Sequence, residues 1–259
     1  MPSTASRVAI VTGASRGIGR ATARRLAADY DHIVAVARTG TALQSLADEL
    51  SAQGRSIHPV AADMKLPTSA GTVVEETLTR FGRIDAVVNI AGAVKQGSLF
   101  ELQEDDWADG MALKLHGARR LVQAAWPALV QQRGCAVFMS GTAAQTPKPL
   151  LAAVATINAA ILALAKVFSE QGLKDGVRVN SVLPGPVLTD RRRTMLEKYA
   201  ASKNLPLDQA MNRYAEETGI IRYGQPEDIA EFIAFLVSPS AAWITGSAFR
   251  VDGGEVKTL

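Results

Sequence analysis

The chain has 259 residues, 47% of them hydrophobic, with 28 lysines and arginines against 25 aspartates and glutamates. This is enough apolar sequence for one large core, so we expect a single domain over residues 1–259. The formal charge of +3 argues against nucleic acid or an anionic membrane as a partner, and Cys135 has no second cysteine to pair with. No apolar run is long enough to cross a bilayer and the N-terminus lacks the apolar core of a signal peptide, so a cytoplasmic location is expected.

Short apolar runs alternate with longer helical patterns along the chain. Strands are predicted at 7–12, 32–37, 57–60, 84–92, 136–140, 177–184 and 247–251. Helices are predicted at 20–30, 42–53, 72–81, 105–132 and 150–173. Gly54 is expected to end the second helix, and Pro127 is expected to kink the fourth.

Strands made of continuous Val, Ile and Ala, separated by helices, indicate a parallel sheet that is covered on both faces. Right-handed crossovers then give an α/β fold of the doubly wound Rossmann type, with about seven strands. Ligands of such sheets bind beyond the carboxyl ends of the strands, where the strand order reverses. The functional residues are therefore expected at that edge.

The first predicted strand runs into TGASRGIG, which contains Gly13, Gly17 and Gly19. Glycines at these places allow a tight turn and a close approach of backbone amides to phosphate, and the helix that follows offers its positive end. A strand before the loop and a helix after it make this a dinucleotide-binding signal. Loops contain glycine for other reasons too, so the glycines alone would be a weak argument.

Two arginines sharpen the prediction of the cofactor. An acidic residue usually ends the second strand when a ribose 2′-hydroxyl is bound, but here Arg38 stands there and Arg16 lies within the glycine loop. Two guanidinium groups suit a 2′-phosphate, so NADP(H) is expected in preference to NAD(H). The alternative is a pair of solvated arginines at loop positions.

These motifs resemble those of the short-chain dehydrogenase/reductase family, in its single-domain form, over nearly the whole chain. TGASRGIG is similar to the family's TGxxxGxG, and Asn89-Ile90-Ala91-Gly92 to its NNAG with one departure. The resemblance implies a cofactor site built from Gly13, Ser15, Arg16, Gly17, Ile18, Gly19, Arg38, Asp63, Met64, Asn89, Ala91, Gly92, Asn158, Pro184, Gly185, Val187 and Thr189. No metal site is predicted.

Family members usually carry an Asn, a Ser, a Tyr and a Lys at the reaction centre. Aligned on intact flanking residues, those places are taken here by Lys114, Gly141, Val154 and Asn158, respectively. The usual tyrosine is the proton donor and the usual lysine lowers its pKa, and valine has no proton to give. Lys114 and Thr142 are therefore the candidate catalytic residues. Alternatively, Lys114 binds an anionic substrate or is a structural lysine.

The stretch YAASK, from Tyr199 to Lys203, has the family's Tyr-x-x-x-Lys spacing at a different place. It follows the sixth strand, in a segment over about 188–223 that we expect to cover the substrate. We expect Tyr199–Lys203 to belong to an ordinary amphipathic helix of this segment. The run Arg191-Arg192-Arg193 at the start of this segment either faces water or attracts an anionic substrate.

Three functions remain open from the sequence. The first is an NADP(H)-dependent reductase of a small carbonyl or alcohol substrate with a non-standard proton donor. The second is a catalytically silent, cofactor-binding partner or sensor, and the third is a non-redox enzyme such as an isomerase, cyclase or dehydratase. The resemblance also implies a homodimer or homotetramer, formed through the helices near 105–132 and 150–173.

Overall fold

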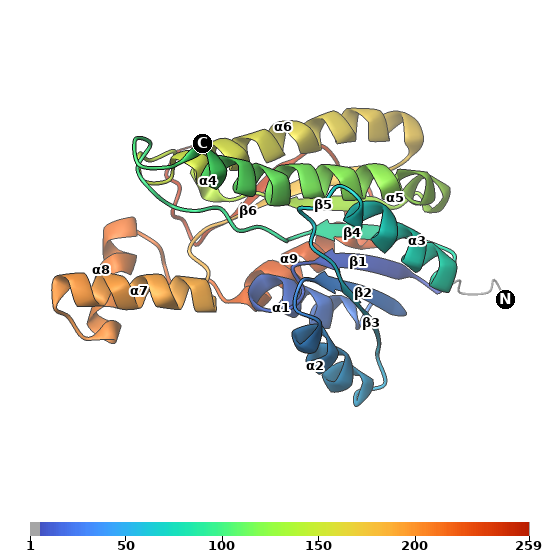
Figure 1. Cartoon of the computed structure of the whole chain (residues 1–259), viewed down its shortest axis with the longest axis horizontal. Helices are drawn as coiled ribbons and strands as arrows, with labels where there is room; N and C mark the ends of the chain where they lie inside the picture. Colours follow the sequence, from blue (N-terminus) through green and yellow to red (C-terminus); the bar gives the residue numbers. More distant parts are fainter. Residues whose placement is uncertain (1–5, 259) are drawn as a thin grey trace.

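A computed structural model describes residues 6–258 and contains one parallel sheet of seven strands, in the order β3-β2-β1-β4-β5-β6-β7 (Figure 1). The strands are β1 (Val8–Thr12), β2 (His32–Ala37), β3 (Ser56–Ala61), β4 (Ala86–Asn89), β5 (Cys135–Met139), β6 (Arg178–Pro184) and β7 (Ala248–Val251). Strand order reverses beside β1, which pairs with both β2 and β4. The predicted doubly wound fold is confirmed.

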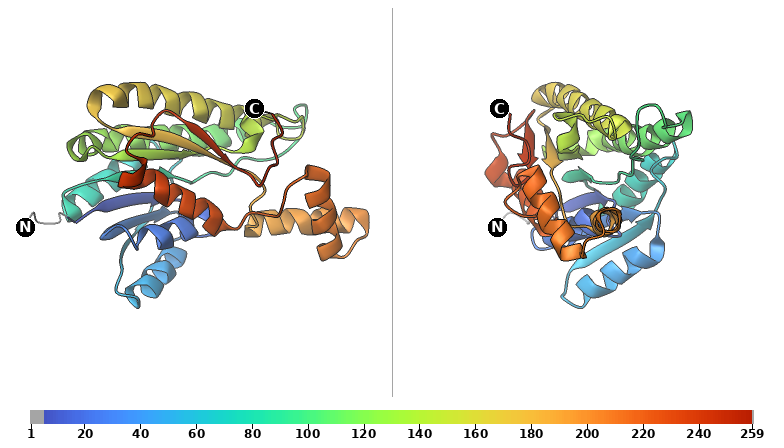
Figure 2. Two further views of the ribbon diagram at one scale, coloured as in Figure 1. Left: turned by 180° about the vertical axis from the view of Figure 1, so that it is seen from behind. Right: turned by 90° about the vertical axis from the view of Figure 1, so that its left-hand side faces the viewer.

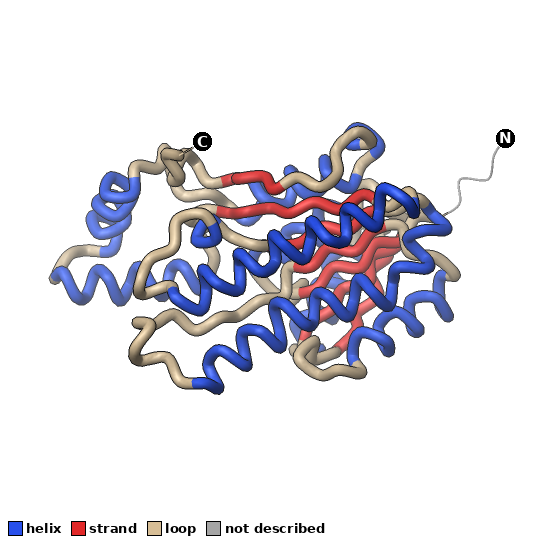
Figure 3. The backbone as a smooth tube through the Cα atoms, turned by 90° about the horizontal axis from the view of Figure 1, so that it is seen from above, coloured by secondary structure: helices blue, strands red, loops and turns tan. Residues whose placement is uncertain are grey.

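Helices cover both faces of this sheet. They are α1 (Gly17–Leu26), α2 (Gly40–Ser51), α3 (Ser69–Phe81), α4 (Glu104–Gly110), α5 (Ala118–Gln132), α6 (Ala152–Asp175), α7 (Asp190–Lys203), α8 (Leu207–Thr218) and α9 (Pro226–Val237). Short helical turns add η1 (Met111–Gly117), η2 (Thr142–Ala144) and η3 (Pro239–Ala241). In Figures 1 and 3, α5 and α6 run side by side along one face, while α1 and α9 lie on the other.

Alternation along the strands explains the two cores. Val8 and Ile10 of β1 pack toward α3, α5 and α6, whereas Ala9 and Val11 pack toward α1, α2 and α9. Successive residues of the strand face opposite sides of the sheet, yet all four are fully buried. The strand is therefore a continuous run of apolar residues. Because every strand pair is parallel, the carboxyl ends of the strands share one edge of the sheet.

The fourth predicted helix departs from expectation. Residues 105–132 were expected to form one helix kinked at Pro127, but α4 gives way to the π-helix η1 before α5 begins. Pro127 lies inside α5. Close packing accompanies the irregular segment, since a Cβ added to Gly117 would lie 2.7 Å from the Met64 carbonyl oxygen. Segments of π-helix are often found at functional sites because they redirect a side chain, and η1 carries Lys114.

The helices α7 and α8 project beyond the carboxyl ends of the strands (Figures 1 and 2). They have a small apolar core of their own, formed by Leu196, Ile220 and Tyr223 with Met195, Met211 and Tyr214 packed against it. This pair occupies the segment that was expected to cover the substrate.

The sequence was expected to contain no apolar run long enough to cross a bilayer, but helix α6 is long and apolar enough if length and composition alone are considered. Core helices of soluble proteins pass the same test, and α6 packs along the sheet through Ile157, Ile161 and Ala165. Packing against the sheet therefore accounts for the apolar residues on the inner side of α6.

Candidate active site and cofactor cleft

The glycine loop leaves no room for side chains next to the end of β4. Gly13 has φ of +71°, and a Cβ added there would lie 2.9 Å from the Ala91 backbone nitrogen. Ile90 and Ala91 both donate backbone hydrogen bonds to Thr12 Oγ1, at 3.0 Å each. The loop then enters α1 at Gly17, so a bare backbone surface precedes a helix N-terminus, as pyrophosphate binding requires.

Arg16 and Arg38 are exposed, and their side chains make no hydrogen bond or ion pair with any residue that the structure describes. Nearby Arg20 and Arg24 behave differently, because both bind Glu49 Oε2, at 2.9 and 2.7 Å. Arg16 lies in the glycine loop and Arg38 directly follows β2. Their free guanidinium groups fit the 2′-phosphate of NADP(H), whose negative charge they would balance.

The other predicted cofactor residues follow the carboxyl ends of neighbouring strands. Asp63 and Met64 follow β3, Asn89 to Gly92 end β4, and Pro184 to Thr189 end β6. Asn89 is buried and its Nδ2 has no partner among the described residues. A Cβ added to Gly17 would lie 3.2 Å from Thr189 Cγ2, so the segment after β6 touches the glycine loop. The segments that the sequence singles out therefore gather at one edge of the sheet, and their residues fit a dinucleotide.

The residues expected at the reaction centre include a hydrogen-bonded cluster. Lys114 Nζ donates to the Ser140 carbonyl oxygen at 3.0 Å and to Asn158 Oδ1. Ser140 Oγ in turn donates to the Asn158 backbone carbonyl at 2.9 Å. The structure thus brings η1, the end of β5 and α6 together through Lys114, and it places Val154 one turn before Asn158 on α6.

Two glycines make the room that this cluster needs. A Cβ added to Gly92 would lie 3.1 Å from Lys114 Cδ, and one added to Gly141 would lie 2.8 Å from Asn158 Nδ2. Gly141 has φ of 164°, an extended backbone open to any residue, so the space above it matters and its backbone angle does not. Lys114, Asn158 and the glycine at 141 are therefore mutually dependent.

The cluster carries positive charge without a carboxylate to balance it. Burial of the ammonium, with a smaller contribution from the positive charge of Arg191, lowers the pKa of Lys114 to about 8. Arg191 donates from Nη2 to the Val94 carbonyl at 2.7 Å, and burial is also the main cause that lowers its own pKa. Within residues 6–258 neither side chain forms an ion pair, so the site favours an anion or a neutral lysine.

Thr142, the other candidate, is engaged elsewhere. Its hydroxyl donates to Glu255 Oε2 at 2.7 Å, so its proton is directed to the C-terminal segment. Sequence reasoning missed Glu255, which lies 113 residues away along the chain. The same segment is tied to the end of α8 by Lys257, whose Nζ donates to the Gly219 carbonyl at 2.7 Å.

YAASK does not enter this cluster. Tyr199 and Lys203 belong to α7, and the Tyr199 hydroxyl donates to Glu217 of α8 at 3.1 Å.

Two other polar side chains near the site also have places of their own. Lys95 forms an ion pair with Asp106 at 2.9 Å. His116 lines a separate groove with Trp107 and Met111, and its pKa is lowered by burial, then by Arg119 and Arg120. None of these side chains contacts Lys114.

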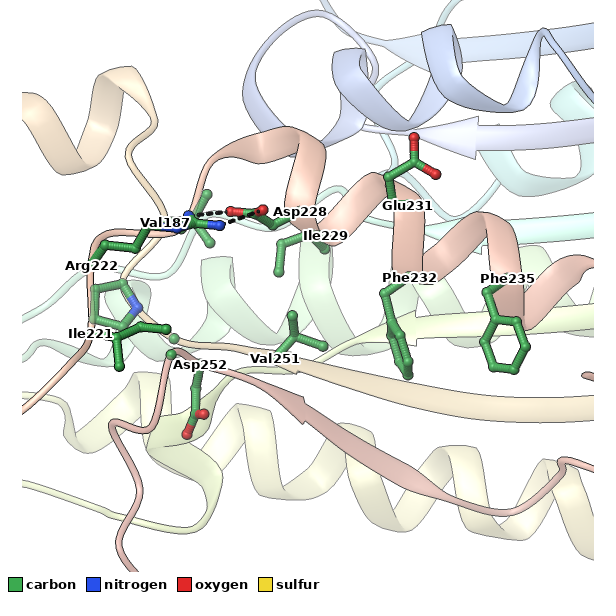
Figure 4. A pocket seen from close by; sticks show the side chains of 14 residues that line it. Val187, Ile221, Arg222, Asp228, Ile229, Glu231, Phe232, Phe235, Val251 and Asp252 are labelled. Atoms are coloured by element: carbon green, nitrogen blue, oxygen red, sulfur yellow. Dashed lines mark hydrogen bonds and ion pairs between the residues drawn. The ribbon is translucent and has the colours of Figure 1, made fainter.

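A groove of about 500 Å³ lies between α9 and β7 (Figure 4). Ile229, Phe232 and Val251 give it an apolar floor, and the ion pair between Arg222 and Asp228, at 2.6 Å, stands at one end. No residue of the Lys114 cluster lines it. It borders the segment after β6 but is separate from the cluster.

Comparison with known proteins gives consistent results along the whole chain. The family model described as enoyl-(acyl carrier protein) reductase matches residues 13–255. A 3-oxoacyl-[acyl-carrier-protein] reductase of Synechocystis sp. is 34% identical over 259 residues, covering 99% of each chain. The FabG enzyme of the same name from Staphylococcus aureus is 29% identical over 251 residues, covering 96% of this chain and 98% of its own.

Solved structures agree with these relatives. L-sorbose reductase from Gluconobacter frateurii, complexed with NADPH and L-sorbose, has a TM-score of 0.93 and 31% identity, with 98% of each chain covered. A variant of actinorhodin polyketide ketoreductase with NADPH has a TM-score of 0.91 and 28% identity, with 98% of this chain and 99% of that chain covered. The cofactor in both matches the NADP(H) expected from Arg16 and Arg38.

We predict that Gly141→Ser destabilises the protein by about 1–3 kcal/mol, because the new side chain overlaps the Asn158 amide in a filled space. Urea unfolding followed by circular dichroism measures the change. Gly71→Ser in α3 is the matched control, since a Cβ there meets nothing within 4 Å. Equal stability of the Gly141→Ser and Gly71→Ser proteins would contradict the prediction.

Proposed function

The chain belongs to the short-chain dehydrogenase/reductase family, and we propose that it is an NADP(H)-dependent reductase of a small carbonyl substrate whose proton donor is Lys114. The observation that carries the proposal is the placement of Lys114 Nζ on Ser140 and Asn158, with a pKa of about 8. The relatives that are reductases with NADPH support the class of reaction.

The cofactor, when bound, supplies a hydride to the carbonyl carbon. The chain's own part is to hold the dinucleotide along the glycine loop and the ends of β1 to β4 and β6, with Arg16 and Arg38 on the 2′-phosphate. Asn158 was also expected to contact the ribose. Its Oδ1 accepts from Lys114, which limits that role to its amide nitrogen.

Lys114 is suited to give the proton. An ammonium has three N–H donors, and two of them point at Ser140 and Asn158, so one is left for the substrate oxygen. The proton moves from Lys114 Nζ to that oxygen as the carbon receives the hydride, which yields the alcohol and a neutral amine. A pKa near the working pH suits this exchange, because the amine then recovers its proton from solvent.

Thr142 is the weaker of the two catalytic candidates in this proposal, because its hydroxyl proton is directed to Glu255. Uncompensated positive charge at Lys114 and Arg191 favours a substrate with a carboxylate or a phosphate. We assign the cover of the substrate to α7 and α8, which lie within the predicted segment 188–223.

We also propose a homodimer or homotetramer in the cytoplasm. Helix α6 keeps Val167 and Leu173 exposed, and α5 runs beside it on the same face (Figure 3). A second copy of this pair of helices would cover those side chains. The single thiol, Cys135, is buried and free.

The experiment that tests the function follows absorbance at 340 nm after NADPH is mixed with neutral ketones and oxo-acids. Oxidation of NADPH supports a reductase. Tight NADPH binding without turnover would support the silent cofactor-binding protein, which the valine at position 154 favours. Conversion of a substrate with unchanged NADPH would support a non-redox enzyme.

We predict that kcat for reduction falls above an apparent pKa of about 8, since the donor must be protonated and Lys114 loses its proton there. Below pH 8 the ammonium is retained and kcat levels off. Lys114→Met should lower kcat about 100-fold or more and remove this pH dependence. A Lys114→Met enzyme with the wild-type profile would exclude Lys114 as the donor.

We predict that Arg191→Met raises KM for an oxo-acid about tenfold, while KM for a neutral ketone stays unchanged, because a charge-assisted hydrogen bond is lost only by the anion. Steady-state kinetics with a matched ketone and oxo-acid measures the ratio. Arg193→Met is the control, because Arg193 is exposed on α7 like Arg191 but its side chain makes no hydrogen bond with the described residues. A parallel rise for both substrates would mean that Arg191 is structural, through its bond to Val94.

A further inference from the structure

Asn158 has one amide atom whose hydrogen bonds are not accounted for. The residue is 3% exposed, on the inner side of α6. An ammonium can only donate, so the atom that receives Lys114 is the oxygen, and this fixes which end of the amide is Nδ2. The orientation of the amide therefore follows from chemistry.

Nδ2 points into the space above Gly141, where a Cβ would lie only 2.8 Å from it. Within residues 6–258 the enclosed side-chain atoms without a partner are Thr22 Oγ1, Asn89 Nδ2 and His116 Nδ1. Asn158 Nδ2 makes no hydrogen bond with the described residues and is still not one of these enclosed atoms. Nδ2 therefore keeps some accessible surface and is free to donate to a bound molecule.

We infer that Asn158 Nδ2 is the donor that orients the substrate carbonyl, in the place that the side chain at position 141 would otherwise fill. The inference rests on the proposed reductase function. It assigns Asn158 to the substrate in addition to the cofactor, and it explains why a glycine stands at position 141. A serine hydroxyl and an amide N–H are both hydrogen-bond donors, so one replaces the other at the same point of the cleft.

Lys114 strengthens this donor. A positive charge bound at Oδ1 draws electron density from the amide and makes its N–H more acidic, as in other chains of hydrogen bonds. The carbonyl oxygen is then held by Nδ2 and by the remaining N–H of Lys114. Two donors aimed at the oxygen where negative charge develops stabilise the transition state.

Asn158→Asp separates the two roles of the side chain. Aspartate keeps an oxygen for Lys114 but has no N–H, so kcat should fall about 100-fold, whereas the Kd of NADPH, from fluorescence titration, should rise much less because only one of many cofactor contacts is lost. The carboxylate also raises the pKa of Lys114, so kcat is compared on the plateaus of full pH profiles. Thr156→Ala, an exposed position on the same helix, is the matched control.

A rescue experiment tests the position of the donor. Asn158→Ala empties the space above Gly141, and adding Gly141→Ser then returns a donor to it. The serine should lower kcat in the wild-type background and raise it at least tenfold in the Asn158→Ala background. The inference is overturned if the serine gives no gain, or if Asn158→Asp keeps wild-type kcat.

A binding measurement keeps the inference testable if the reductase function itself fails. That failure would appear as no oxidation of NADPH by the wild-type protein with any ketone or oxo-acid. The infrared carbonyl band of [3-13C]acetoacetate is then compared in its complexes with NADP⁺ and wild-type or Asn158→Asp protein. A lower stretching frequency in the wild type alone supports the donor, and a wild-type band at the solution frequency overturns it.

Discussion

The hydrogen bonds of one ammonium organise the reaction centre of this protein. Lys114 Nζ joins the carbonyl of Ser140, at the end of β5, to the side chain of Asn158, in the second turn of α6. Ser140 Oγ also donates a hydrogen bond to the Asn158 backbone carbonyl, which links the same two segments a second time. A buried cation has a large desolvation cost, and these oxygen acceptors offset part of it without supplying a full negative charge. The part of the desolvation cost that the acceptors do not offset lowers the pKa of Lys114.

The residues around the ammonium are packed so that each makes room for the next. Gly92 leaves space for the stem of Lys114, and Gly141 leaves space for the amide of Asn158. A larger residue at either place would push against a hydrogen-bonded side chain, so each substitution depends on the others. The expected cofactor site does not depend on this packing to the same extent, because the glycine loop and the ends of several strands form most of it.

Much of the fold was predictable because its physical cause is local. HIVAVA is a run of buried apolar residues, and β2 has the predicted bounds His32–Ala37. Gly54 has the expected positive φ just after α2. The break in the helix near Lys114 was not predictable, since Met111–Gly117 has an ordinary helical pattern and its π geometry comes with the packing of Gly117 against Met64.

The candidate site was predictable only in part, for a similar reason. A register aligned on flanking motifs identified Lys114, Gly141, Val154 and Asn158, but it could not show that Lys114 binds Asn158 or that Asn158 fills the space above Gly141. Glu255 had no local signal at all. Its contact with Thr142 depends on β7 being the last strand of the sheet, which brings the C-terminal segment back to the end of β5. Because that contact takes the proton of Thr142, the tertiary fold, more than the residue type, separates the two candidate donors and leaves Lys114.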